Sequence, residues 1–457
     1  MDLGHVIGNI AANIGERFGL NDADVVGDLR RGELPQFADI PTIINQVLFN
    51  AGDLLPRVPR LNINDPLVGL NTELVGFIKN LQSQFGQLDS RQRSSIQNSC
   101  RSFKCDQQSV QNTQAKQELF SKMLAFDESV GGGKGSPDRV NLRFDRTQQV
   151  KQAMLKRANL SHIIVPADNG VFDRDVLLTE HQANFLLNEL GEAGVGADVA
   201  GGAGNRRSPR SGLYFQENPV QKWDIWHPIQ YTLDDSLEEA DKQVIREALH
   251  EISINSCILF KYNNTTPQGY HLNYMKVDSP TFCGLSYIGR TDPANPIYLS
   301  FQCDDSRGVA MHETMHALGV SHQHLRLDRD KHIKIDWSNI DPQHYDTFAI
   351  ADAKLYTSYG TKYAYDSIMH YNAYLAARDP SKPTMIPLVS PQENLPKMGQ
   401  RAKLTRADIR LLKKMYCRPG CDDSNVHCGT WALNGYCKHK DHNKWMTDNC
   451  KASCDKC

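Results

Sequence analysis

Residues Met311–Asp330 read MHETMHALGVSHQHLRLDRD. On a helix, His312 and His316 lie one turn apart on one face, so their imidazoles can share a metal ion. Gly319 stands where the helix must end, because glycine adopts a left-handed turn without steric cost. That turn can bring His322 back as a third nitrogen ligand. Three protein ligands leave one coordination position open, which is typical of catalytic rather than structural zinc sites.

Glu313 follows the first histidine, so its carboxylate projects near the metal without entering the ligand set. Bound Zn²⁺ lowers the pKa of water to about 7 and polarises a carbonyl group. Glu313 is placed to take the proton from that water and pass it to the leaving amine. The spacing therefore predicts peptide-bond hydrolysis with no covalent intermediate. A helix with two surface histidines is the alternative for H-E-x-x-H alone, but H-E-x-x-H-x-x-G-x-x-H is far more specific.

Downstream, Tyr365–Tyr371 reads YDSIMHY. A methionine in a tight turn after the third zinc ligand is typical of metzincins. Together with the sequence RLDRD at Arg326–Asp330, these motifs resemble those of the astacin family of metalloproteases. The resemblance implies that Met369 forms a hydrophobic floor under the metal. It also implies that Tyr371 can ligate zinc at rest and swing away to stabilise the oxyanion.

One position after the third histidine departs from the family pattern. Astacins usually carry Glu there, where it helps to receive the new amino terminus after activation, and this chain has Gln323. Glutamine can hydrogen-bond but cannot form an ion pair. We expect the zinc chemistry to survive, and the coupling of maturation to activity to be the property affected. No spacing argument gives His324 or His370 a ligand role, so both are expected to be structural or exposed.

The chain has 457 residues and a net charge of −2. This length predicts two or three domains, and the near-zero charge gives no electrostatic reason to expect nucleic acid or a membrane surface as a partner. No stretch is long and apolar enough to span a bilayer. Half of the cysteines lie in the last few dozen residues, which predicts disulfides and an oxidising compartment.

The sequence divides into four parts. We expect residues 1–130 to be the helical N-terminal part of a pro-region, with helices over Leu74–Phe85 and Leu119–Phe126. Residues 138–210 would hold the latency motif and the cleavage loop, 211–417 the astacin-like catalytic domain, and 421–457 a ShKT domain. Met1–Leu20 reads as an amphipathic helix rather than a signal peptide. Either the leader is missing from this sequence or export uses another route. We expect a secreted protein with a missing leader, because the cysteines require an oxidising compartment.

Within the catalytic part, the expected strands and helix precede the zinc helix. The strands are Ile229–Leu233, Ile258–Tyr262 and Ile297–Phe301, and the helix is Leu237–Ile254. The half that follows the zinc helix reads as largely irregular. This order predicts an α+β fold, and the resemblance implies the two-subdomain metzincin architecture with the zinc helix at its centre.

Residues Val171–Val176 read VFDRDV, which resembles the latency motif F-x-G-D-[IMV] of astacin pro-regions with Arg174 in place of Gly. In that motif the Asp ligates zinc in place of the catalytic water. Asp175 is therefore the candidate that holds a zymogen inactive, and a carboxylate is a good fourth zinc ligand. The alternative is that Asp175 caps a helix starting near Thr179.

A Gly- and Ala-rich stretch over residues 191–204 leads to a basic cluster. Arg207-x-x-Arg210 matches the minimal recognition pattern of furin-like convertases, and mobile loop tips are where proteolytic nicking concentrates. We expect an activating convertase to cut between Arg210 and Ser211. A solvated basic surface is the alternative.

The astacin resemblance implies two disulfides that brace the catalytic domain, Cys257–Cys417 and Cys283–Cys303. The spacing of the last six cysteines resembles the ShKT domain, which is named for a potassium-channel-blocking toxin. That resemblance implies Cys421–Cys457, Cys428–Cys450 and Cys437–Cys454, whereas cysteine spacing alone leaves fifteen connectivities open. Cys100 and Cys105 are close enough for a local disulfide.

Glycosylation sequons begin at Asn159, Asn263 and Asn264. In the last module, Lys444-Trp445 resembles the basic and aromatic pair with which the toxin plugs a channel. On a protease, we expect this module to dock substrate or bind extracellular matrix.

Together these features predict a secreted zinc endopeptidase made as a zymogen, with one Zn²⁺ per chain and protein or peptide substrates. The alternative is a binding protein that acts through its ShKT module and has an inactive protease fold.

Overall fold

The computed structural model describes residues 88–101, 104–131, 135–191, 212–215, 219–279, 281–349, 356–418, 420–425 and 427–456, all within one compact unit. Three expected features lie outside these residues. They are the helices over Met1–Leu20 and Leu74–Phe85 and the cleavage site at Arg210 and Ser211.

Residues 88–191, called the helical region below, contain the helices α5 (Ser90–Cys100), α6 (Val110–Gly131), α7 (Pro137–Arg157) and α8 (Glu180–Leu190). The helix expected over Leu119–Phe126 lies within α6. Thr179 caps α8 in a capping box with Gln182, because each side chain bonds to the other residue's backbone N–H. The helix cap is therefore Thr179, and the carboxylate of Asp175 is not used as a cap.

A mixed sheet forms the centre of the fold. Its strands are β1 (Val176–Leu177), β3 (Ile229–Leu233), β4 (Phe260–Tyr262), β5 (Leu272–Lys276), β6 (Gly284–Tyr287) and β7 (Asn295–Leu299), in the order β1-β6-β7-β5-β3-β4. Strands β6 and β7 pair antiparallel, and the other neighbours are parallel. The edge strand β1 belongs to the helical region, so this region is built into the sheet.

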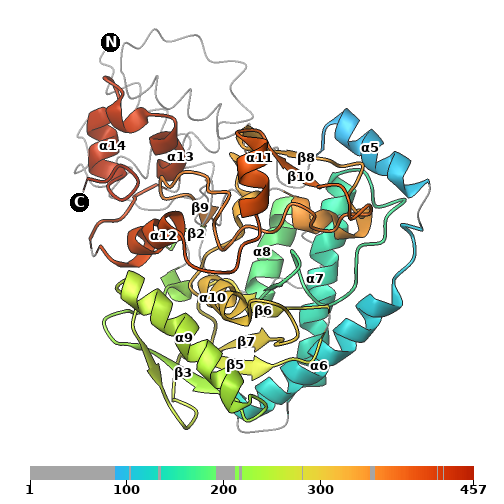
Figure 1. Cartoon of the computed structure of the whole chain (residues 1–457), viewed down its shortest axis with the longest axis horizontal. Helices are drawn as coiled ribbons and strands as arrows, with labels where there is room; N and C mark the ends of the chain where they lie inside the picture. The colour runs from blue at the N-terminus through green and yellow to red at the C-terminus, as the bar shows by residue number, and fades with distance from the viewer. Residues whose placement is uncertain are drawn as a thin grey trace, which may run out of the picture. The chain divides into compact units, whose positions relative to one another are not determined.

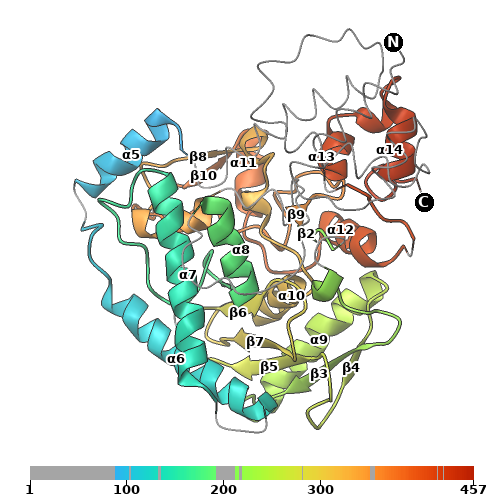
Figure 2. The ribbon, with the colours of Figure 1, turned by 180° about the vertical axis from the view of Figure 1, so that it is seen from behind.

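The strands β5, β6 and β7 are buried on both faces, whereas the edge strand β4 is largely exposed. On one face, side chains such as Tyr274 and Ile297 pack with α9 (Glu239–Asn255) and α10 (Ser306–Ala317). Figure 1 shows α9 crossing β3 and β5. On the opposite face, side chains such as Met275 and Tyr298 pack with α6 and α7, which lie beside β5, β6 and β7 in Figure 2. The helical region thus covers one face of the sheet at β5, β6 and β7.

The half after α10 has little regular structure, as expected. It contains the short antiparallel pairs β8 (Ile333–Ile335) with β10 (Met385–Pro387) and β2 (Gly212–Leu213) with β9 (Tyr356–Thr357). Short 3₁₀ turns, among them η4 (Gln323–Leu325) and η6 (Pro342–Phe348), and the helices α11 (Pro391–Asn394) and α12 (Arg406–Tyr416) complete it. A mixed sheet packed with helices before α10, and a largely irregular half after it, confirm the predicted α+β class.

The C-terminal module contains α13 (Cys428–Leu433) and α14 (Asn443–Asn449). Its own core is small, with Cys428, Trp431, Met446 and Cys450 as its buried members. The module also contacts the rest of the chain. The Tyr214 hydroxyl donates to the Asp423 carbonyl at 3.0 Å, and the buried Lys414 ammonium on α12 lies 3.2 Å from the Asp455 carboxylate.

The structure forms the disulfides Cys100–Cys105, Cys257–Cys417, Cys283–Cys303, Cys428–Cys450 and Cys437–Cys454. Cys421 is also disulfide-bonded, and its expected partner Cys457 lies outside the described residues. Among the helices that the structure describes, none is both long and apolar enough to cross a membrane.

Candidate metal centre

Helix α10 carries His312 and His316 one turn apart, and both are fully buried. The helix ends at Ala317, and Gly319 follows with φ of +93°. Glycine is the residue that adopts this conformation without strain. The reversal brings His322 back, so that its Nε2 lies 3.1 Å from Nε2 of His316 and 3.3 Å from Nε2 of His312. The structure thus brings the three predicted histidines together.

The other ring nitrogens of these histidines are held by oxygen atoms. Nδ1 of His312 lies 2.7 Å from the Ile368 carbonyl, and Nδ1 of His316 lies 2.7 Å from the Val320 carbonyl. Because a carbonyl only accepts, each Nδ1 must carry the proton, and each Nε2 presents a lone pair to the centre. Burial lowers the pKa of both imidazoles, which keeps them neutral.

Three converging nitrogens at these spacings fit a tetrahedral cation. Zn–N bonds of about 2.0–2.1 Å place tetrahedral ligands about 3.3–3.4 Å apart. Burial alone would lower the pKa of His322, but Asp173 and Asp175 together raise it to about 10. The site therefore strongly favours a positive charge at its centre, and a metal ion supplies one.

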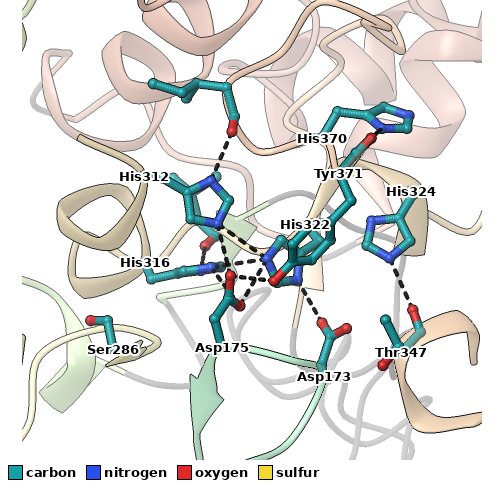
Figure 3. Close-up of polar contacts among 12 residues, drawn as sticks. Asp173, Asp175, Ser286, His312, His316, His322, His324, Thr347, His370 and Tyr371 are labelled. Carbon is teal, nitrogen blue, oxygen red and sulfur yellow. Dashed lines mark hydrogen bonds and ion pairs between the residues drawn. The ribbon is translucent and has the colours of Figure 1, made fainter. Parts of the chain in front are cut away.

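Asp175 completes the group of four possible ligands, whose ligand atoms all lie within 4.8 Å of one another. Its carboxylate oxygens lie 3.3 Å from Nε2 of His312, 3.5 Å from that of His316 and 3.1 Å from that of His322. Figure 3 shows the three imidazoles pointing at this carboxylate. Strand β1 fixes its position, because the Ser286 N–H donates to the Asp175 carbonyl at 3.1 Å.

Tyr371 closes another side of the site. Its hydroxyl donates a short hydrogen bond to the Asp175 carboxylate, and its ring centroid lies 4.6 Å from that of His322. Burial, followed by the negative charges of Asp175 and Asp173, raises the pKa of the Tyr371 phenol well above its ordinary value. The phenol is therefore protonated and can act as a hydrogen-bond donor.

Glu313 lies beside the histidines on α10 and is 1% exposed. Its Oε2 has no hydrogen-bond partner among the described residues. Burial and the nearby Asp175 charge raise the pKa of Glu313 well above its ordinary value, while Arg401 opposes the shift. A buried carboxyl with an open oxygen and a raised pKa is suited to proton transfer.

The methionine turn supports the site from the C-terminal half. Met369 is 1% exposed, and its carbonyl accepts from the Gln323 N–H at 2.9 Å. The Asp408 carboxylate at the start of α12 accepts from the Ile368 N–H at 3.0 Å and from the Ser367 hydroxyl. Since the Ile368 carbonyl holds His312, Asp408 supports the first histidine through one intervening residue.

The remaining predicted residues lie away from the centre. His324 bonds to the Thr347 carbonyl at 2.9 Å, and His370 bonds to the Tyr363 hydroxyl at 2.8 Å, so both are buried and structural. Trp445 of the C-terminal module packs edge-to-face on Trp431. Its ring is thus part of the module's own packing.

The sequon asparagines differ in exposure. Asn159 and Asn264 are exposed, whereas the Asn263 side-chain amide donates to Gln230 at 2.6 Å. The structure therefore leaves two of the three amides open for a glycan.

Asp173, Asp346 and Lys151 are among the residues at the site that were not anticipated from the sequence. The Asp173 carboxylate lies 2.6 Å from Nδ1 of His322, its backbone N–H donates to Asp346 at 3.0 Å, and Asp346 lies 3.4 Å from the Lys151 ammonium. The only local signal was that Asp173 lies two residues before Asp175 in VFDRDV. Asp173 and Arg174 have φ of +47° and +72°, which shows why the family motif has Gly at the second of these positions.

Comparison with known proteins agrees with this geometry. Residues 215–417 match the family model described as astacin (peptidase family M12A), and residues 420–457 match the ShK domain-like model. The chain is 78% identical to zinc metalloproteinase nas-9 of Caenorhabditis elegans, over 100% of this chain and 90% of that protein. It is 54% identical to zinc metalloproteinase nas-10 of the same organism, over 93% of this chain and 79% of that protein.

Among solved structures, the chain is similar to high choriolytic enzyme 1, a hatching enzyme zinc-protease from Oryzias latipes. The identity is 24%, the match covers 44% of this chain and 96% of that chain, and the TM-score is 0.39.

The family model over the catalytic residues and the long matches to named zinc metalloproteinases coincide with a site built for one metal ion. The chain belongs to the astacin family and is a zinc metalloendopeptidase with a C-terminal ShK domain.

Proposed function

We propose that this metalloendopeptidase is made as a secreted zymogen whose helical region blocks the zinc site. The observation that carries this proposal is the position of Asp175, whose carboxylate lies among the three Nε2 atoms. A substrate carbonyl and the attacking water need the same space. The uncleaved chain should therefore be inactive toward proteins.

In the mature enzyme, His312, His316 and His322 would hold the zinc. When bound, zinc polarises the scissile carbonyl and makes the attacking water more acidic. Glu313 takes the proton from that water and delivers it to the leaving amine. Its open Oε2 atom and raised pKa support this role.

Tyr371 has two proposed roles. In the uncleaved chain its hydroxyl holds the Asp175 carboxylate. Once Asp175 has left, the same hydroxyl is free to donate to the oxygen that becomes negative in the transition state. The pKa of the phenol, raised by burial, keeps the donor proton in place.

The compartment and the partners are also proposals. The disulfides support an oxidising, extracellular location. A convertase that cuts between Arg210 and Ser211 would start maturation, and protein or peptide substrates would include extracellular matrix. A role for this chain as a binding protein with an inactive protease fold is not favoured, because the three histidines converge and Glu313 is buried beside them.

The test measures digestion of a general protein substrate by the mature enzyme, defined as the chain cut after Arg210 and separated from the preceding residues. Wild type should digest it, while Glu313→Gln and wild type with a zinc chelator should not. Glu313→Gln should retain zinc, and the matched surface variant Glu247→Gln should behave as wild type. If mature wild type with bound zinc digests no protein, the proposal is wrong.

Latency is tested with the uncut chain. Uncut wild type should be inactive, and uncut Asp175→Ala should digest the substrate. Asp175→Ala combined with Glu313→Gln should be inactive again, which shows that the activity comes from this site. Full activity of uncut wild type would disprove the zymogen and leave the protease activity standing.

A further inference from the structure

The helical region and the catalytic residues share one hydrophobic core. No member named here is more than 6% exposed. The helical region contributes Leu119, Met123 and Phe126 from α6 and Val140 and Phe144 from α7, and the sheet contributes Met275, Leu285, Tyr287 and Tyr298. Removal of this apolar surface from water stabilises the association of the two parts.

Buried polar contacts join the same two parts. The Lys151 ammonium on α7 lies 3.4 Å from the Asp346 carboxylate on η6, and both side chains are almost fully buried. Asp346 also accepts from the Asp173 N–H at 3.0 Å. The Gln182 side chain on α8 donates to the Ile288 carbonyl at 2.9 Å. Removing one partner of a buried charge pair is strongly destabilising, because the other charge is then left buried and uncompensated.

The same network of contacts reaches His322, one of the three proposed zinc ligands. The Asp173 carboxylate lies 2.6 Å from Nδ1 of His322, behind the ring, while Asp175 lies in front of it. Figure 3 shows both carboxylates approaching this one imidazole. A carboxylate behind a ligating histidine fixes the ring and strengthens it as a ligand. The helical region therefore holds the site from two sides.

None of these contacts depends on the loop between α8 and β2, where the cut is proposed. The disulfide Cys100–Cys105 closes within the helical region, and the other disulfides whose two cysteines the structure describes lie within the catalytic and C-terminal parts. Cleavage of the loop would break the covalent link, but the two resulting chains would still share a sheet, a core and a buried ion pair.

We propose that the cleaved helical region stays bound to the catalytic domain as a non-covalent inhibitor, and that activity appears only when it dissociates. The surface involved is the sheet face of β5, β6 and β7, and its partner is α6 and α7 of the same chain. This inference rests on the zymogen proposed above and adds a second activation step to it. Dilution, or a second cut within the helical region, would complete activation.

The experiment replaces Asn205–Arg210 with the recognition site of a specific protease, so that the cut is complete and controlled. The cut protein is analysed by size exclusion at micromolar concentration, and its activity is followed over a thousandfold dilution. We expect the helical fragment to co-elute with the enzyme. Activity per enzyme should be low at micromolar concentration and rise at least tenfold after dilution.

Variants in the helical region test the interface without changing the mature enzyme, because these residues are absent from it. Phe144→Ala removes a core ring and should weaken fragment binding by about 10²- to 10³-fold. Lys151→Met is a second variant that breaks the ion pair. Leu142→Ala is the matched control, since Leu142 lies on the same helix and is 37% exposed. The first two should release active enzyme at micromolar concentration, and the control should behave as wild type.

If the fragment separates from the wild-type enzyme at once and full activity appears without dilution, the inference is overturned, whereas the inactivity of the uncut chain would still support the zymogen. Co-elution with full activity would also overturn the inference, because the bound helical region would then not block the site. The zymogen would still stand in that case as long as uncut wild type is inactive and uncut Asp175→Ala is active.

Discussion

Gly284 lies directly against Glu313: a Cβ atom on Gly284 would be 2.5 Å from both Cγ and Oε1 of the glutamate. Gly284 begins β6, and Glu313 projects from α10, which packs on that strand. Cβ atoms do not approach other atoms so closely, so a larger residue at 284 must displace the carboxylate. The glycine therefore sets the position of the proposed general base.

The first prediction concerns Gly284→Ala in the mature enzyme. We expect kcat/KM to fall about 100-fold, since a displacement of about 1 Å at a reacting group costs about that much. Zinc content should be unchanged, because the three atoms nearest to the added Cβ all belong to Glu313 and none to a histidine. Ser286→Ala on the same strand is the control and should keep near-normal activity. An active Gly284→Ala enzyme would show that Glu313 tolerates displacement.

The second prediction separates binding from chemistry at Tyr371. Removal of one oxyanion donor typically costs about 10²-fold or more in kcat. Tyr371→Phe should therefore lower kcat of the mature enzyme by about 10²-fold and change KM little. Steady-state kinetics on a peptide substrate measures both. The control Tyr374→Phe changes a half-exposed neighbouring tyrosine and should leave kcat and KM unchanged. If Tyr371→Phe has the same kcat as wild type, Tyr371 has no role in the mechanism.

The third prediction follows from the support that Asp408 gives to His312 through Ile368. Asp408→Ala leaves the buried Ile368 N–H and the Ser367 hydroxyl without their acceptor, and each unsatisfied group costs about 1–3 kcal/mol. We expect a lower melting temperature and faster transfer of zinc to a chelator. Asp408→Asn, which keeps one acceptor oxygen, should show a smaller effect. Unchanged zinc release in Asp408→Ala would contradict the link to His312.

Local patterns were enough to predict the central elements. The expected strand Ile229–Leu233 is observed with those bounds as β3, and the zinc helix ends before Gly319 as its φ requires. Strands β5 and β6 were not predicted. Both are buried on two faces, so their sequences lack the alternation of polar and apolar residues that marks a half-exposed strand.

Sequence patterns predicted those ligands of the site that lie close together in the chain. The histidines lie within eleven residues, and helix geometry together with the left-handed turn at Gly319 brings them together. Asp175 contacts Tyr371, which lies 196 residues away in the sequence. Because local spacing does not show a contact over that separation, Asp175 was identified through the family motif. Asp173 and His322 are 149 residues apart, and no local pattern links them. Such partners become visible only when the chain is folded.

The last prediction concerns Asp423, where the C-terminal module meets Tyr214. The carboxylate is 2% exposed and accepts from the Ser453 N–H at 2.9 Å and from the Ser453 hydroxyl. Burial raises the pKa of Asp423 from 3.8 to about 6, although the hydrogen bonds from Ser453 oppose the shift. The folded state therefore binds this proton more tightly than the unfolded state does.

The sign of the pH effect follows from that direction. Stability from the protonated group is fully present below about pH 4 and is lost as the pH rises to about 6. At 1.36 kcal/mol for each pKa unit, the cost above pH 6 is on the order of 3 kcal/mol. Asp423→Asn removes this cost, so its melting temperature should exceed that of wild type at pH 7.5 and match it at pH 4. A difference that stays constant across this range would show that the folded protein does not shift the pKa of Asp423.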